Sequence, residues 1–225
     1  MSAPTVVFDL DGTLIDTAPD LVATLNAVFK LEGVPAVPFA EARNMVGAGA
    51  RRMIELGLKR AARTAAPIDV DRMFNDFIAY YAAHIADHSQ PFPGLLDALD
   101  GLASQGFNFA VCTNKLEGLS RLLLDELSLT SRFVAICGQD TFAVSKPNPE
   151  ILRRTISRAG GSLDRAVMVG DSVADIDVAH AAKIPVIAVD FGYTDTPVAQ
   201  LAPDRIISHF DQLQGAVFEL LPRRA

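Results

Sequence analysis

The sequence predicts an α/β protein in which a doubly wound, Rossmann-like parallel sheet forms the core and a small all-helical domain is inserted near its start. Two patterns in the 225 residues predict this class. Short apolar runs alternate with helical periodicity over most of the chain, which is typical of a parallel sheet with helices on both faces. One long interval after the first strand holds helical patterns alone, which indicates a separate lobe.

Each expected strand is a short and mostly apolar run, as in strands that are buried on both faces of a sheet. In chain order the runs are Thr5–Phe8, Phe107–Cys112, Phe133–Ile136, Ala166–Val169, Val186–Val189 and Arg205–Ile207. Apolar residues at helical spacing fill the intervals between the later strands. They predict helices at Leu95–Ser104, Leu116–Leu127, Pro149–Ala159 and Ala174–Ala182.

The inserted domain is expected between the first two strands, because residues 17–88 contain no convincing strand. Its first helix is predicted to start with Thr17-x-x-Asp20, which resembles a capping box. The expected helices are 17–33, Arg51–Arg63 and Val70–Ala86. A linker rich in turn residues then returns to the core. The predicted domains are residues 17–88 for the helical insertion and residues 1–16 with 89–225 for the core.

Composition and charge exclude several classes of protein and partner. Hydrophobic residues make up 50% of the chain, as in ordered globular proteins. The formal net charge of −7 is spread without a block of Lys or Arg, which argues against nucleic acid or an anionic membrane as a partner. No apolar run reaches the roughly 18 residues that span a membrane. We expect a cytoplasmic protein, either a monomer or a homodimer.

Polar residues follow the expected strands at their carboxyl ends, where open parallel sheets bind ligands. Asp9 follows the first strand, Thr113 the second and Asp171 the fourth, so these three side chains are expected to converge in one crevice. The candidate site residues at these positions are Asp9, Asp11, Gly12, Thr113, Asn114, Lys146, Asp171 and Asp175.

The acidic residues of this set predict a metal site. Asp9 and Asp11 are two positions apart, and Asp171 and Asp175 add two more carboxylates to the same crevice. Like charges held this close raise each other's pKa unless a cation intervenes. Since the ligands would all be oxygen atoms, without His or Cys, the expected cofactor is Mg²⁺ rather than zinc.

The same crevice has the groups that phosphoryl transfer requires. One carboxylate can attack phosphorus and form an aspartyl-phosphate intermediate, and a second can protonate the leaving oxygen and later activate water. A hydroxyl from Thr113 and the ammonium of Lys146 can stabilise charge on the phosphoryl oxygens. The expected partner is therefore a small phosphorylated metabolite.

At these positions the chain resembles the haloacid dehalogenase-like hydrolase superfamily over almost its whole length. The matching motifs are Asp9-Leu10-Asp11-Gly12-Thr13, Thr113-Asn114-Lys115, Lys146-Pro147 and Gly170-Asp171-Ser172-x-x-Asp175. The helical insertion lies where that family has a small cap domain, and we use the name cap domain for residues 17–88.

The resemblance implies a role for each motif residue. Asp9 would be the nucleophile and Asp11 the acid and base. The side chains of Asp9 and Asp171 and the backbone carbonyl of Asp11 would hold Mg²⁺, with Asp175 acting through water or a neighbouring ligand. The residues implied to hold the phosphoryl group are Gly12, Thr113, Asn114 and Lys146.

A narrower resemblance, to bacterial phosphoglycolate phosphatases, implies 2-phosphoglycolate as the substrate. It rests on residues 11–21, on Thr113-Asn114-Lys115, on Val46-Gly47-x-Gly49, on Phe191-Gly192-Tyr193-Thr194-Asp195 and on the Ile206-Ile207-x-x-Phe210 tail. Ala48 departs from this pattern, because a polar residue is expected between the two glycines. That departure concerns the substrate and leaves the catalytic residues unaffected.

Substrate contacts from the cap domain are predicted at Gly47, Gly49 and Arg51, with Arg51 recognising a carboxylate. A purely structural turn and a solvated arginine are the alternatives at these positions. Tyr81 is expected to pack in the core or between the lobes. The other functions considered are a sugar phosphomutase or a pyrophosphatase on the same fold, a halide-releasing enzyme, and a binding or regulatory protein without catalysis.

Overall fold

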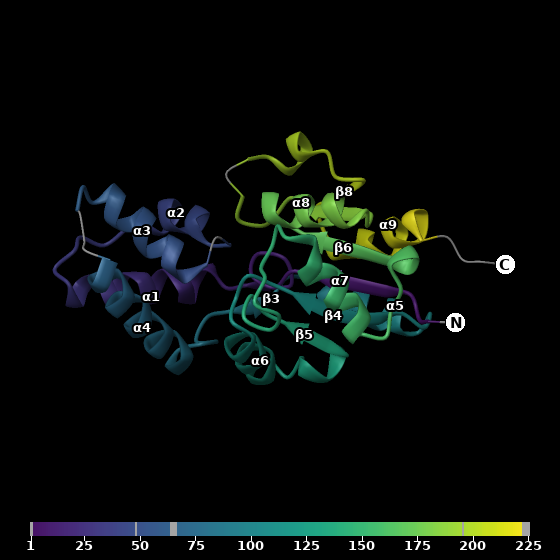
Figure 1. Cartoon of the computed structure of the whole chain (residues 1–225), viewed down its shortest axis with the longest axis horizontal. Coiled ribbons are helices and arrows are strands. Elements are labelled where there is room, and N and C mark those ends of the chain that lie inside the picture. Colours follow the sequence, from purple (N-terminus) through teal and green to yellow (C-terminus); the bar gives the residue numbers. More distant parts are fainter. Residues whose placement is uncertain (1, 48, 64–66, 195, 222–225) are drawn as a thin grey trace.

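A six-stranded sheet, parallel throughout, runs through the centre of the protein (Figure 1). Its spatial order is β5-β4-β1-β6-β7-β8. The strands are β1 (Thr5–Phe8), β4 (Asn108–Cys112), β5 (Ala135–Cys137), β6 (Ala166–Gly170), β7 (Val186–Val189) and β8 (Arg205–Ile207). The computed structural model describes residues 2–47, 49–63, 67–194 and 196–221, so Ala48 and Asp195 of the sequence motifs lie outside the described residues.

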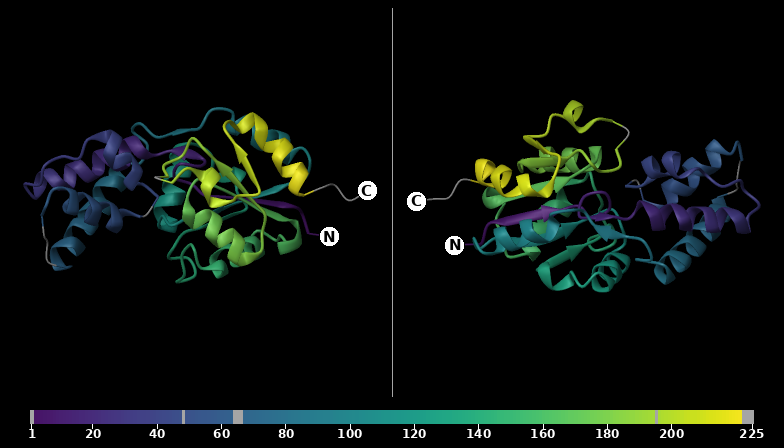
Figure 2. Two further views of the ribbon diagram at one scale, coloured as in Figure 1. Left: turned by 90° about the horizontal axis from the view of Figure 1, so that it is seen from above. Right: turned by 180° about the vertical axis from the view of Figure 1, so that it is seen from behind.

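Strand β1 occupies the middle of the sheet because its residues are buried on both faces. Val6 and Phe8 belong to one apolar cluster, and Val7 belongs to the cluster on the opposite face. Helices α5 (Leu95–Ala103), α6 (Glu117–Glu126) and α9 (Leu213–Leu220) contribute side chains to the first cluster. Helices α7 (Pro149–Arg158) and α8 (Val173–Ala182) contribute to the second, and Figure 2 shows helices on both faces of the sheet. The predicted α/β class is confirmed.

The helices of the insertion lie together beyond the end of the sheet at which β1 finishes (Figure 1). They are α1 (Ala18–Leu31), α2 (Phe39–Ala42), α3 (Ala50–Arg60) and α4 (Pro67–Ala83). Helix α4 packs against both α1 and α3. The short helix α2 was not expected from the sequence, because four residues are too few to show helical periodicity.

The two connections between the sheet and these helices run side by side as a short antiparallel pair. Strand β2 (Ile15–Asp16) pairs with β3 (Gln90–Pro91), and neither was predicted. Each strand has only two residues, too few to show the alternating pattern of a strand, and the second strand contains a proline. The pairing brings the exit from the core and the return to it to one place.

The predicted capping box at the start of α1 is wrong. The Thr17 hydroxyl makes no cap hydrogen bond and instead donates to Asp11 Oδ1 at 2.8 Å. The buried carboxylate of Asp20 accepts hydrogen bonds from His88 N, Ser89 N and Ser89 Oγ, 68 and 69 residues further along the chain. These tertiary partners replace the local ones, and Asp20 thereby joins α1 to the return linker.

A membrane span was not expected, and none of the helices in the described part of the chain is long and apolar enough to form one. The two cysteines, Cys112 and Cys137, are buried and free on the adjacent strands β4 and β5. Both side chains belong to the apolar packing of the core, as their sequence context predicts.

Candidate active site

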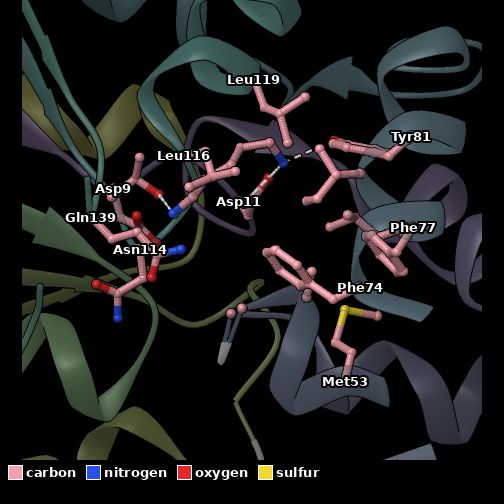
Figure 3. Close-up of a pocket in the computed structure, with 17 residues that line it drawn as sticks. Asp9, Asp11, Met53, Phe74, Phe77, Tyr81, Asn114, Leu116, Leu119 and Gln139 are labelled. Carbon is pink, nitrogen blue, oxygen red and sulfur yellow. Dashed lines mark hydrogen bonds and ion pairs between the residues drawn. The ribbon is translucent and has the colours of Figure 1, made fainter. Parts of the chain in front are cut away.

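The parallel register brings the polar residues after three strands to one edge of the sheet. Phe8, the last residue of β1, pairs with Val111 of β4 on one side and with Val169 of β6 on the other. Asp9, Thr113 and Asp171 come just after these positions, so the convergence expected from the sequence is observed. Figure 3 shows Asp9 and Asn114 close together at this edge.

Three buried carboxylates form the centre of the site. Asp9, Asp171 and Asp175 each offer an oxygen within 4.8 Å of the others. Burial raises the pKa of Asp9 to about 6, and the charge of Asp175 adds to this effect while Lys146 opposes it. Burial, together with the charges of Asp175 and Asp9, raises the pKa of Asp171 to about 8. The cluster therefore favours an added positive charge.

The ammonium of Lys146 supplies part of that charge. Its Nζ lies 2.6 Å from Asp175 Oδ1 and 2.7 Å from Asp9 Oδ1, and all three side chains are buried. Burial alone would lower the pKa of Lys146, but the charges of Asp175 and Asp9 outweigh burial and raise it. The contact to Asp9 Oδ1 is an ion pair outside hydrogen-bond geometry, and this buried oxygen accepts no hydrogen bond.

These groups fit a divalent cation. The donors are all carboxylate oxygens, and one of them is without a hydrogen bond. The ammonium of Lys146 contacts only two of the three acids. Hard oxygen ligands of this kind suit Mg²⁺. The carboxylate of Asp11 was expected to share this space with that of Asp9, but it does not belong to the group and contacts Lys115 and Thr17 instead. The predicted metal ligand at this position is the backbone carbonyl.

Asp171 is oriented by groups that pack tightly around its carboxylate. Its Oδ1 accepts a hydrogen bond from Thr13 Oγ1 at 2.9 Å, and its Oδ2 accepts one from Tyr193 N at 2.8 Å. Gly12 has a φ of +83°, and a Cβ there would lie 2.5 Å from Asp171 Oδ2. A Cβ on Gly192 would lie 2.3 Å from the same oxygen. Both glycines are needed where the backbone approaches this carboxylate.

Gly192→Ala is expected to weaken Mg²⁺ binding about 10- to 100-fold, the usual effect of disturbing the groups that orient a metal ligand. The added methyl group would displace the Asp171 carboxylate, with which it would overlap. Isothermal titration calorimetry with Mg²⁺ measures the change. Gly118→Ala is the matched control, because a Cβ at Gly118 meets nothing within 4 Å. Equal affinities for the two variants would contradict the assignment of Asp171.

The carboxylate of Asp11 is held by an ion pair that was not predicted from the sequence. Lys115 Nζ lies 2.8 Å from Asp11 Oδ1 and 3.2 Å from Oδ2, and it also donates to the hydroxyl of Tyr81 in α4 at 2.9 Å. Burial alone would lower the pKa of Lys115, but Asp11 and Tyr81 raise it. The signal in the sequence is a lysine three residues after the end of a buried strand, in the motif Thr113-Asn114-Lys115.

Thr113 and Asn114 both face the crevice but make different contacts. Thr113 Oγ1 accepts a hydrogen bond from Lys115 N at 3.2 Å. The Asn114 amide accepts from Lys146 N at 2.9 Å and donates to Lys146 O at 3.2 Å. Asn114 therefore positions the backbone of the loop that carries Lys146, a role that its motif alone does not indicate.

A pocket with about 570 Å³ of empty space, including its opening to solvent, lies between these groups and the inserted helices (Figure 3). The sheet side is polar and includes Asp9, Asp11, Thr113, Asn114 and Lys115. The helical side is largely apolar and includes Met53, Phe74, Phe77, Ile78 and Tyr81. A ligand in this pocket would meet its charged partners on the sheet side.

The predicted cap contacts divide into two groups. Gly47 and Gly49 line the pocket. Arg51 is not among the lining residues. Its guanidinium lies 2.5 Å from Asp71 Oδ1 and 5.2 Å from the centroid of the Phe74 ring. Arg51 is therefore engaged with neighbours on α4, and the structure does not bring it to the other predicted site residues.

Comparison with known proteins gives consistent matches. A family model described as haloacid dehalogenase-like hydrolase matches residues 6–189. A protein from Mesorhizobium japonicum named phosphoglycolate phosphatase is 48% identical over 225 residues, covering 100% of this chain and 99% of that protein. One of the same name from Agrobacterium fabrum is 43% identical, covering 97% and 94%. A crystal structure described as a predicted phosphoglycolate phosphatase from Haemophilus somnus has a TM-score of 0.88 at 27% identity, covering 96% of this chain and 98% of that one.

Proposed function

The chain belongs to the haloacid dehalogenase-like hydrolase family and is an enzyme of the phosphatase type. From that premise we propose that it is a Mg²⁺-dependent phosphatase of the cytoplasm, which hydrolyses 2-phosphoglycolate to glycolate and phosphate. The proposal rests chiefly on the buried cluster of Asp9, Asp171 and Asp175 around Lys146. The names of the two relatives support the choice of substrate.

In the first half of the reaction, an oxygen of Asp9 attacks phosphorus and forms an aspartyl-phosphate. The bond between phosphorus and the leaving oxygen breaks, and Asp11 delivers a proton to that oxygen. Lys146, 2.7 Å from Asp9, and the hydroxyl of Thr113 stabilise the charge of the phosphoryl oxygens.

In the second half, Asp11 takes a proton from water, which attacks the aspartyl-phosphate and releases phosphate and free Asp9. Mg²⁺ would be held by the side chains of Asp9 and Asp171 and the backbone carbonyl of Asp11, and it would neutralise the phosphoryl charge. Asp175, whose oxygens accept hydrogen bonds from Lys146 and Ser172, would act through water or a neighbouring ligand. Thr17 keeps Asp11 near its position through the 2.8 Å hydrogen bond to Oδ1.

Residues 17–88 serve as the cap domain in this proposal. Their apolar side chains Met53, Phe74 and Phe77 form one wall of the pocket and exclude water from the phosphoryl group. The turn at Gly47 and Gly49 contributes to the same wall. Paired linkers, β2 and β3, place the exit and return of this domain together, which suits opening and closing about one hinge.

The test is Mg²⁺-dependent release of phosphate from a panel that holds 2-phosphoglycolate, hexose phosphates, nucleotides and pyrophosphate. We expect the highest kcat/KM with 2-phosphoglycolate and no release after chelation of the metal. Preference for a hexose phosphate or pyrophosphate would contradict the proposed substrate but not the proposed phosphatase chemistry. Inactivity with every compound would overturn the proposed function.

A further inference from the structure

Lys115 is the pocket-lining residue with a positively charged side chain, among those that the structure describes. Lys146 is not among the residues that line the pocket, and its ammonium is paired with Asp9 and Asp175. Arg51 and Arg52 are paired with Asp71 and Glu55 on the exposed side of the cap helices. A second anionic group on a substrate in this pocket would therefore find its counter-charge at Lys115.

The ammonium of Lys115 is fixed by two side chains at the edge of the pocket, where a ligand can reach it. Its Nζ contacts Asp11 Oδ1 at 2.8 Å and Tyr81 Oη at 2.9 Å, and it lies 4.4 Å from the centroid of the Tyr81 ring. Asp11 comes from the core and Tyr81 from α4, so the cation sits where the two walls of the pocket meet (Figure 3). An ammonium has three N–H donors. The third makes only the longer contact to Asp11 Oδ2 at 3.2 Å, and a ligand oxygen can take the place of that contact.

The chemistry of the substrate determines where its carboxylate lies. In the proposed reaction Asp11 protonates the leaving oxygen, which must then be within hydrogen-bond reach of Asp11. In 2-phosphoglycolate a single methylene group separates that oxygen from the carboxyl carbon. The carboxylate is thus confined to the neighbourhood of Asp11, where the Lys115 ammonium lies 2.8 Å from the acid. Next to the apolar wall, an unpaired carboxylate would be costly.

We infer that Lys115, together with the Tyr81 hydroxyl, binds the substrate carboxylate and makes the pocket selective for phosphomonoesters that carry a carboxylate one carbon from the ester oxygen. This inference rests on the proposed function. It assigns the substrate specificity of the enzyme to Lys115 in the core rather than to Arg51 in the cap domain. A site with a buried charge also discriminates strongly against compounds that leave this charge unpaired.

Lys115→Met tests the inference through a ratio of two substrates, 2-phosphoglycolate and ethyl phosphate, which lacks the carboxylate. We expect kcat/KM for 2-phosphoglycolate relative to ethyl phosphate to fall about 10- to 100-fold, the range for a hydrogen bond to a charged group. Tyr81→Phe is expected to lower the same ratio by a smaller factor. Arg51→Met is the control and is expected to leave the ratio unchanged.

Binding gives a readout that needs no turnover. With Asp9→Asn as background, calorimetry compares the affinity for 2-phosphoglycolate with and without Lys115→Met, and Lys115→Gln serves if the methionine variant fails to fold. A selective loss of 2-phosphoglycolate affinity supports the inference. Equal losses of affinity for both compounds would mean that Lys115 only positions Asp11. A shift in the kcat/KM ratio caused by Arg51→Met would mean that Arg51 binds the carboxylate. Either result overturns the inference and leaves the proposed phosphatase activity unaffected. Inactivity of the parent protein would instead contradict the proposed function.

Discussion

Replacing Asp9 by asparagine is expected to lower the rate of phosphate release by a factor of at least about 10⁴, as loss of a covalent nucleophile does in other hydrolases. Asparagine has nearly the shape of aspartate, but its amide does not attack phosphorus. Lys146 retains its second partner, Asp175 at 2.6 Å, so the surroundings of the site are preserved. Single-turnover kinetics with 2-phosphoglycolate measures the loss.

The same variant has an expected effect on stability that separates loss of chemistry from loss of fold. Because burial raises the pKa of Asp9 to about 6, the metal-free folded protein loses stability as pH rises through that value and Asp9 ionises. Asparagine has no such ionisation. We therefore expect the metal-free variant to gain thermal stability relative to the parent above pH 6 and to lose that advantage near pH 4. A variant that is inactive because it is unfolded would contradict this account.

Lys146→Met is expected to reduce both stability and activity by large amounts. The lysine side chain is 2% exposed and Asp175 is 0% exposed, so the substitution leaves buried carboxylates without their cation. Breaking a buried ion pair by removal of one partner costs about 3–5 kcal/mol. Activity should fall by about 10²-fold or more, because the phosphoryl charge loses one stabilising group.

Urea denaturation in the absence of divalent metal measures the stability change for Lys146→Met. Added Mg²⁺ is expected to recover part of the loss, since a cation in the acidic cluster neutralises the same carboxylates. Lys59→Met, on the exposed surface of α3, is the control and should stay within about 0.5 kcal/mol of the parent. A Lys146 variant as stable as this control would show that the acids are compensated in another way.

Much of the molecule could be predicted from short stretches of sequence. The strand at Thr5–Phe8 is confirmed with its predicted bounds, because a buried parallel strand needs a continuous apolar run. The family resemblance, drawn from four motifs, is confirmed by the family model and by relatives at up to 48% identity. The convergence of Asp9, Thr113 and Asp171 followed from strand ends alone, since parallel strands finish at one edge.

Other features depended on partners distant in the chain. Asp20 looked like part of a local cap but binds the backbone at His88 and Ser89. Lys115 belonged to the second motif without a predicted role, and folding brings it to Asp11 and Tyr81. Arg51 was the expected anion contact, yet its guanidinium faces Asp71.

The sequence by itself therefore determined the fold class, the catalytic edge of the sheet and the family of this protein, because these depend on local periodicity and on the order of strands. Only the tertiary structure decided which charges meet. A hydrogen bond or ion pair within a few ångströms forms between side chains that packing brings together, as with Lys115 and Asp11, 104 residues apart. Local patterns do not specify such a contact, and in this protein it is the one from which substrate specificity is inferred.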